Sequence, residues 1–268
     1  MAKLSVNETT TFRWSLEEDV ATYSAKAIPA IGVWRQKLSD FGPDRAAQLL
    51  TEHGLEASHL FWAGGFTGSD GRTYRESVQD ACEAVRVAAE LKAGCLVVCS
   101  GARAGHTFNH ANRLLKDALA EVVPCAEQHR IVLALEPMHP GCATDCTFLT
   151  SLDDALRLLD VVDSPWVKLV LDTYHLGHDP ALPARIPEVV SQIALVQLGD
   201  ARRPPEGEQN RCRLGEGTLP LGELVAALKT AGYDGYYDVE LLGEDVESCD
   251  YPSLLDHAKA AYADLVGE

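Results

Sequence analysis

Short apolar runs alternate along this chain with longer segments of helical period. The clearest helix is predicted over residues 74–92, where Val78, Ala81, Val85 and Ala88 follow one another at the three- and four-residue spacing of one buried face. Further helices are predicted at residues 16–25, 43–53, 111–129, 152–162, 221–231 and 252–266, with a short one at 187–192. Between them lie apolar runs typical of buried strands, at residues 9–14, 28–33, 57–62, 95–100, 131–136, 167–172, 193–198 and 236–241.

Eight strand–helix units in 268 residues predict an α/β protein, a (β/α)8 TIM barrel formed as a single domain over residues 1–268. An open, doubly wound sheet is the structural alternative. Such a sheet usually has a glycine-rich phosphate loop after an early strand, and neither GxGxxG nor GxxxxGK[ST] occurs here. The pattern therefore favours the closed barrel.

Polar side chains stand where four consecutive late strands are expected to end: Glu136, Asp172, Gln197 and Glu240. In a barrel these ends are neighbours at the C-terminal mouth, where the active sites of this fold are built. Each residue alone would more often cap a turn. Four in consecutive units favour a divalent metal site instead, because three converging carboxylates need a cation to neutralise them.

The expected ligand set is rich in oxygen, with three carboxylates and the amide of Gln197. Hard oxygen ligands favour Mn²⁺ first and Mg²⁺ second, with Zn²⁺ or Co²⁺ as further possibilities. A separate zinc cluster of His139, Cys142 and Cys146 is the weaker alternative, since no fourth ligand lies near it in the sequence.

Net charge and cysteine content limit the classes of partner and the cellular compartment that we expect. The formal net charge of −17 opposes binding to nucleic acid phosphates and to anionic lipid, so we expect neither a nucleic acid nor a membrane partner. The beginning of the chain has no apolar signal region, and no apolar run approaches 18 residues. The eight cysteines include no CxxC pair, which favours reduced thiols and a cytoplasmic protein.

Five ordered runs carry a family resemblance: LEPMHP, LVLDTYH, VQLGDARRPP, LGEGTLPL and GYDGYYDVEL, spread over residues 131–242. Together they resemble the xylose isomerase-like barrel superfamily of sugar phosphate isomerases and epimerases. The resemblance implies four metal ligands, at Glu136, Asp172, position 197 and Glu240. Many members have histidine at the third position, where this chain has Gln197.

The resemblance also implies the chemistry. In the ketose epimerases of this family, one glutamate removes a proton next to the carbonyl and the other returns a proton from the opposite face. These roles fall to Glu136 and Glu240. The same comparison implies that His175 contacts substrate oxygens and that Arg203, six residues past the third ligand, holds the substrate.

Two further histidines are candidates for the site. His106, after the fourth predicted strand, would reach the pocket as a substrate-binding residue. His139, three residues past Glu136, is a candidate catalytic base, because a neutral imidazole suits proton removal near pH 7. In the C-glycoside-cleaving relatives, which resemble this segment, a histidine here is a proposed base. A purely structural histidine next to Pro140 is the alternative for His139.

We therefore expect a metal-dependent sugar isomerase or epimerase that acts on a ketose or sugar phosphate through an enediolate. One alternative is a lyase, hydratase or C-glycoside-cleaving enzyme that acts on a 3-keto sugar with the same metal. Another is a non-catalytic sugar-binding barrel or subunit, which the glutamine at position 197 leaves open. The partner is a small sugar, and homo-oligomers are common among family members.

Overall fold

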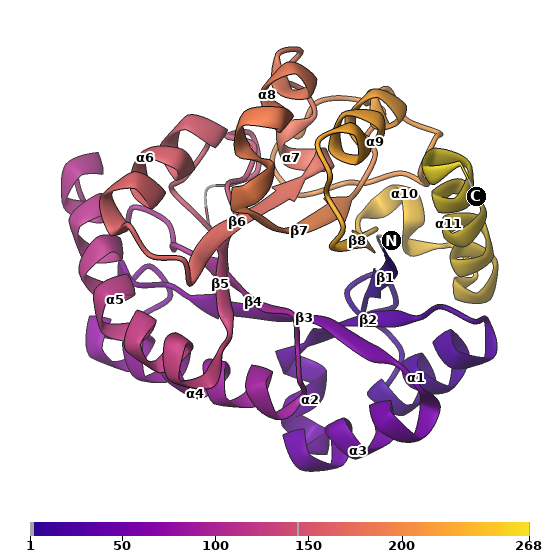
Figure 1. The fold of residues 1–268 in the computed structure, drawn as a ribbon, viewed down its shortest axis with the longest axis horizontal. Helices are drawn as coiled ribbons and strands as arrows, with labels where there is room; N and C mark the ends of the chain where they lie inside the picture. The colour runs from indigo at the N-terminus through magenta and orange to yellow at the C-terminus, as the bar shows by residue number, and fades with distance from the viewer. Residues whose placement is uncertain (1–2, 144, 268) are drawn as a thin grey trace.

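The computed structural model describes residues 3–143 and 145–267, in which parallel strands β1 to β8 close into one barrel in sequence order (Figure 1). The domain predicted over residues 1–268 thus includes residues 1–2, 144 and 268, which lie outside the described part. Strand β1 pairs with β8 and closes the ring. The strands are β1 (Lys3–Asn7), β2 (Ala30–Trp34), β3 (Glu56–Gly64), β4 (Cys95–Cys99), β5 (Val132–Leu135), β6 (Val167–Asp172), β7 (Ile193–Leu198) and β8 (Tyr236–Val239).

Helices surround the barrel and cover its outer face (Figure 1). Several begin at residues that accept a hydrogen bond from the first turn, such as Ser15, Thr73 and Ser151. The helices are α1 (Leu16–Ala25), α2 (Arg35–Phe41), α3 (Pro43–His53), α4 (Tyr74–Glu90), α5 (Phe108–His129), α6 (Leu152–Val162), α7 (Thr173–Leu176), α8 (Leu182–Val189), the 3-10 helix η1 (Val190–Gln192), α9 (Leu221–Thr230), α10 (Glu244–Glu247) and α11 (Tyr251–Val266). None of the helices described is long and apolar enough to cross a membrane.

Alternation along the strands divides the core into two layers. Outward side chains pack against the helices in one large cluster, whereas Val97, Ala134, Val170 and Leu195 belong to a separate cluster inside the barrel. The inward positions two residues further on are Glu136, directly after β5, Asp172 at the end of β6 and Gln197 in β7. The strand period therefore places the predicted site directly above the apolar cluster inside the barrel.

The other half of the barrel interior is polar. Asp238 of β8 accepts hydrogen bonds from Ser5 (2.7 Å) and Asn7 (3.3 Å) of β1. His59 of β3 lies 3.8 Å from the same carboxylate and 3.0 Å from the hydroxyl of Ser58. All of these side chains are fully buried or nearly so, and their hydrogen bonds link β1 to β8 and, across the barrel interior, to β3.

Most predicted elements are confirmed, and the first strand is wrong. Residues 9–14 form turns after β1, which lies at Lys3–Asn7. The inward positions of β1 are the polar Ser5 and Asn7, so the true strand lacks the continuous apolar run that the prediction required. The short helix predicted at 187–192 is also too late, because α8 begins at Leu182 despite Pro183 and Pro187.

Candidate active site

The four residues predicted as metal ligands meet at the C-terminal mouth of the barrel. Glu136 follows β5, Asp172 ends β6, Gln197 lies in β7 and Glu240 follows β8. Their side chains are at most 3% exposed. Successive parallel strands with a common inward register bring them together, as the sequence pattern indicated.

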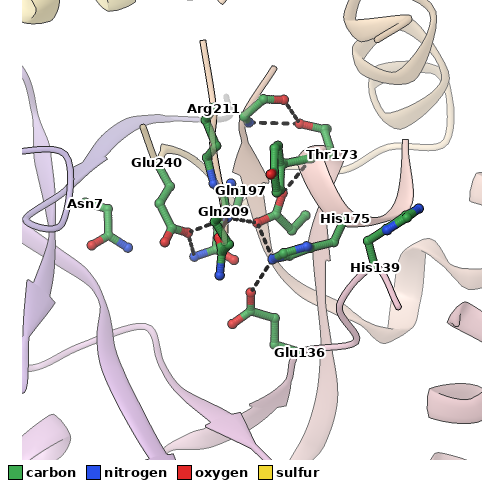
Figure 2. Close-up of polar contacts among 12 residues, drawn as sticks. Asn7, Glu136, His139, Thr173, His175, Gln197, Gln209, Arg211 and Glu240 are labelled. Carbon is green, nitrogen blue, oxygen red and sulfur yellow. Dashed lines mark hydrogen bonds and ion pairs between the residues drawn. The ribbon is translucent and has the colours of Figure 1, made fainter. Parts of the chain in front are cut away.

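Direct contacts join these side chains (Figure 2). The Nε2 of Gln197 donates to Oε2 of Glu240 at 2.6 Å. The Nη2 of Arg211 lies 2.9 Å from Oδ2 of Asp172 and 3.6 Å from Oε2 of Glu240. Figure 2 shows Glu136 and Glu240 approaching this group from different sides. The arrangement is therefore two glutamates flanking an Asp–Gln–Arg centre.

His175 belongs to the same cluster. It lies on α7, the short helix that begins directly after Asp172, and its Nε2 is 3.8 Å from Oε1 of Glu136 and 4.0 Å from Oδ2 of Asp172. Donor atoms of Glu136, Asp172 and His175 all lie within 4.8 Å of one another, which makes them a candidate metal-binding triad. The family resemblance implied a substrate contact for His175 and did not place it among the metal ligands.

Burial controls the proton affinities in the cluster. The pKa of Glu136 is raised well above its usual value, first by burial and then by the charges of Glu240 and Asp172. Burial also raises the pKa of Glu240 to about 7, although the Arg211 charge opposes that rise. Burial lowers the pKa of His175 to about 3, so its imidazole is neutral near pH 7. A neutral imidazole is the form that ligates metals.

The donor set fits a divalent cation. When all three carboxylates are ionised they carry −3 and Arg211 carries +1, which leaves −2 among buried side chains. Among the described residues, neither Oε1 of Gln197 nor Nε2 of His175 has a hydrogen-bond partner. Buried polar atoms without partners are costly, and a divalent ion would satisfy these donors and offset the remaining charge.

Arg211 is the site residue that the sequence analysis missed. Its side chain is buried, its guanidinium lies 4.5 Å from the ring centre of Tyr174, and Gly199 leaves it room, since a Cβ at Gly199 would come 2.5 Å from Nη1. Arg203, predicted from its six-residue spacing after Gln197, lies exposed on the rim of the neighbouring cavity.

A turn after β7 explains this placement. Asp200 accepts hydrogen bonds from the amides of Gly215 (2.9 Å) and Gly217 (3.0 Å), which ties the LGEG turn back to the end of the strand. The segment before that turn is thereby drawn over the mouth, and it carries Arg211. The turn, which the sequence displays, is a better guide to the buried arginine than the distance from Gln197.

The other two histidines predicted for the site, His139 and His106, lie apart from the carboxylates. His139 is half-buried, its Nδ1 accepts a hydrogen bond from the Gly141 amide at 3.0 Å, and its ring packs against His178. His106 contacts the carbonyl of Thr67 and the ring of His110. Within the described part of the chain, none of the contacts of His106 is with the carboxylate cluster.

Comparisons with known proteins agree with this architecture. L-ribulose-5-phosphate 3-epimerase UlaE of Escherichia coli is 26% identical over 140 residues, which are 52% of this chain and 46% of that protein. D-psicose 3-epimerase of Enterocloster bolteae is 30% identical over 118 residues, 44% of this chain and 36% of that protein. The chain thus spans about half the length, or less, of the curated relatives it matches. Both are named epimerases, in line with the predicted class of enzyme.

The solved structure of protein SMc04130 from Sinorhizobium meliloti 1021 is 27% identical, with a TM-score of 0.90 over 98% of both chains. A family profile described as the xylose isomerase-like TIM barrel matches residues 20–264. The profile match covers β2 to β8 and every residue of the site described above. The chain therefore belongs to the xylose isomerase-like TIM barrel family.

Proposed function

We propose that the protein is a metal-dependent carbohydrate epimerase or isomerase that moves a proton at a carbon next to a carbonyl. The observation that carries this proposal is the pair of buried glutamates, Glu136 and Glu240, on different sides of one polar centre (Figure 2). Two bases facing one carbon from opposite directions are what epimerisation requires. The named activities of the two curated relatives support the same class.

In the proposed reaction, one glutamate carboxylate removes the proton and the carboxylic acid of the other glutamate donates a proton to the opposite face. The raised pKa values of Glu136 and Glu240 suit this exchange, because a group that titrates near neutral pH both accepts and releases protons readily. Arg211 lies beside the carboxylates, where it would hold substrate oxygens and orient the reacting carbon.

We assign the metal to Glu136, Asp172, His175 and Glu240, with Gln197 contributing its free Oε1. When bound, a divalent ion would polarise the substrate carbonyl and stabilise the charge of the enediolate. Oxygen donors joined by one imidazole favour Mn²⁺ over Mg²⁺. Metal analysis of protein purified without added metal tests this choice, and a stoichiometric zinc content would contradict it.

A lyase or hydratase that acts on a 3-keto sugar with His139 as base is the second reading. It has less support, because Nδ1 of His139 accepts the Gly141 amide proton. The neutral ring then carries its proton on Nε2 and has no free lone pair to act as a base. A sugar-binding protein without catalysis would have no need of the paired glutamates.

The decisive experiment is proton exchange. We would incubate the Mn²⁺-loaded protein with D-psicose or L-ribulose in D2O and follow deuterium at carbon 3 by NMR. Glu240→Gln and Glu136→Gln are each expected to abolish exchange, whereas His139→Ala is expected to retain it. Exchange that persists in both glutamine variants would exclude the proposed bases, and loss in His139→Ala alone would favour the lyase.

A further inference from the structure

A cavity of about 500 Å³ lies beside the carboxylate cluster at the barrel mouth. Part of its lining comes from Thr9 and Phe12, which follow β1, and from Trp34 at the end of β2. Most of the rest comes from residues 203–206, 208–210, 242–244 and Glu247, in the segments after β7 and β8. The buried carboxylates themselves do not line it, so it is a separate space next to the reacting centre.

Three residues connect this cavity to the catalytic cluster. Thr9 contacts the carboxylate of Glu240, and Oε1 of Gln209 accepts a hydrogen bond of 3.0 Å from Nη2 of Arg211. Tyr174 lies beneath the Arg211 guanidinium. All three also line the cavity. A molecule held by the carboxylates would therefore extend into this space.

The charges around the cavity oppose a phosphate group. Glu206, Glu208, Glu244 and Glu247 line it, and Arg203 is the single cationic residue among the lining residues described. The nearby Arg202 is already paired with Glu216 and Asp245. A phosphate dianion in this cavity would be lined by four carboxylates and one guanidinium, and like-charge contacts of this kind cost affinity.

The apolar surface in the cavity suits an uncharged ring instead. Phe12 is 45% exposed, which makes it one of the most exposed large apolar side chains described, and Trp34 is partly exposed beside the same space. Aromatic faces pack against the C–H faces of sugar rings. Cavities of about 300–1,000 Å³ enclose ligands of drug size, so about 500 Å³ leaves space beyond one monosaccharide.

We propose that the substrate is an unphosphorylated, uncharged sugar that carries a second ring, with the reacting sugar on the carboxylates and the second ring against Phe12 and Trp34. This inference rests on the proposed function, because it takes the carboxylate cluster as the reacting centre. It distinguishes this chain from a relative that acts on a sugar phosphate, such as UlaE by its name.

The test compares three probes with the Mn²⁺-loaded protein: the monosaccharide D-psicose, the two-ring ketose lactulose and L-ribulose 5-phosphate. We expect kcat/KM for deuterium exchange to be highest for lactulose, and lowest, by at least about tenfold, for the phosphate. The highest rate with the phosphate would overturn the inference while the proposed proton transfer stands.

Variants separate the two halves of the inference. Phe12→Ala should lower the ratio of lactulose to psicose kcat/KM by up to about tenfold, the value of one aromatic contact. Phe108→Ala is the matched control, since Phe108 is a similarly exposed phenylalanine on α5, outside this cavity. Glu244→Lys should raise the phosphate rate relative to psicose. An unchanged lactulose-to-psicose ratio in Phe12→Ala, or an unchanged phosphate-to-psicose ratio in Glu244→Lys, would overturn the inference.

If no probe exchanges deuterium, calorimetric binding keeps the two proposals distinguishable. Lactulose that binds more tightly than L-ribulose 5-phosphate, with the preference lost in Phe12→Ala, supports the cavity assignment even though the proton transfer then fails. Equal or weaker binding of lactulose would overturn the cavity assignment as well.

Discussion

Replacing Arg211 with methionine tests the electrostatic description of the site most directly. Arg211 is fully buried and lies 2.9 Å from Asp172 and 3.6 Å from Glu240. Without its charge, the three site carboxylates are left without a cationic neighbour. Removing one partner of a buried ion pair costs about 3–5 kcal/mol in the free energy of unfolding, and we expect Arg211→Met to lose that amount near pH 8.

The loss should depend on pH in a defined direction. The pKa of Glu240 is already raised to about 7 in the folded protein, and Arg211 acts to lower it. Removing Arg211 raises that pKa further, so the folded state of the variant holds this proton over a wider pH range. A raised folded pKa favours folding at low pH, and the benefit is lost as the pH rises from the unfolded value through the folded one.

Urea unfolding of the metal-free protein, followed by circular dichroism near pH 5 and near pH 8, measures both quantities. The control is Arg202→Met, because Arg202 makes exposed ion pairs with Glu216 and Asp245, which contribute at most about 1 kcal/mol. An equal loss for Arg211→Met at both pH values would indicate lost packing against Tyr174, and a negligible loss would refute the reasoning.

Three further predictions follow from burial. His59 is buried and its pKa is lowered to about 3. Between pH 7 and pH 4 the wild type should therefore lose about 3 kcal/mol of unfolding free energy relative to His59→Gln, as measured by urea unfolding. Parallel pH curves for the two proteins would contradict this. Leu224→Ala on α9 should cost about 2–5 kcal/mol, against less than about 1 kcal/mol for the exposed Val161→Ala, and equal midpoints would refute the packing argument. His175→Ala should weaken Mn²⁺ binding in calorimetry by about tenfold or more; an unchanged Kd would remove His175 from the ligand set.

The sequence was most informative where strands are apolar on both faces. Runs such as Cys95–Cys99 and Val167–Asp172 are buried between the apolar cluster inside the barrel and the surrounding helices. Their composition alone therefore identifies them as strands. The barrel then follows from the number of strand–helix units. The common register at the strand ends brings Glu136 and Glu240 close to the same centre. Strand β1 escaped prediction because its inward face is polar and belongs to the network around Asp238.

The parts of the site that could not be predicted are those set by loops. His175 joins the ligands because α7 begins directly after Asp172 and places its third residue near Glu136. Arg211 reaches the centre because the turn that follows it, at Gly215 and Gly217, is anchored to Asp200. The positions of both side chains depend on the path that a loop takes in space, which the spacing of residues along the chain does not determine.

The pairing of β1 with β8 has a consequence for the order in which the protein assembles. Lys3 pairs with Tyr236, 233 positions further along the chain, so closing the ring brings together the most distant strands and carries the largest entropic cost. Thr9 and Glu240 lie on the two sides of this seam, which is where the substrate would bind. In refolding, helical signal should therefore return before activity, and the delay between the two measures the time the ring takes to close.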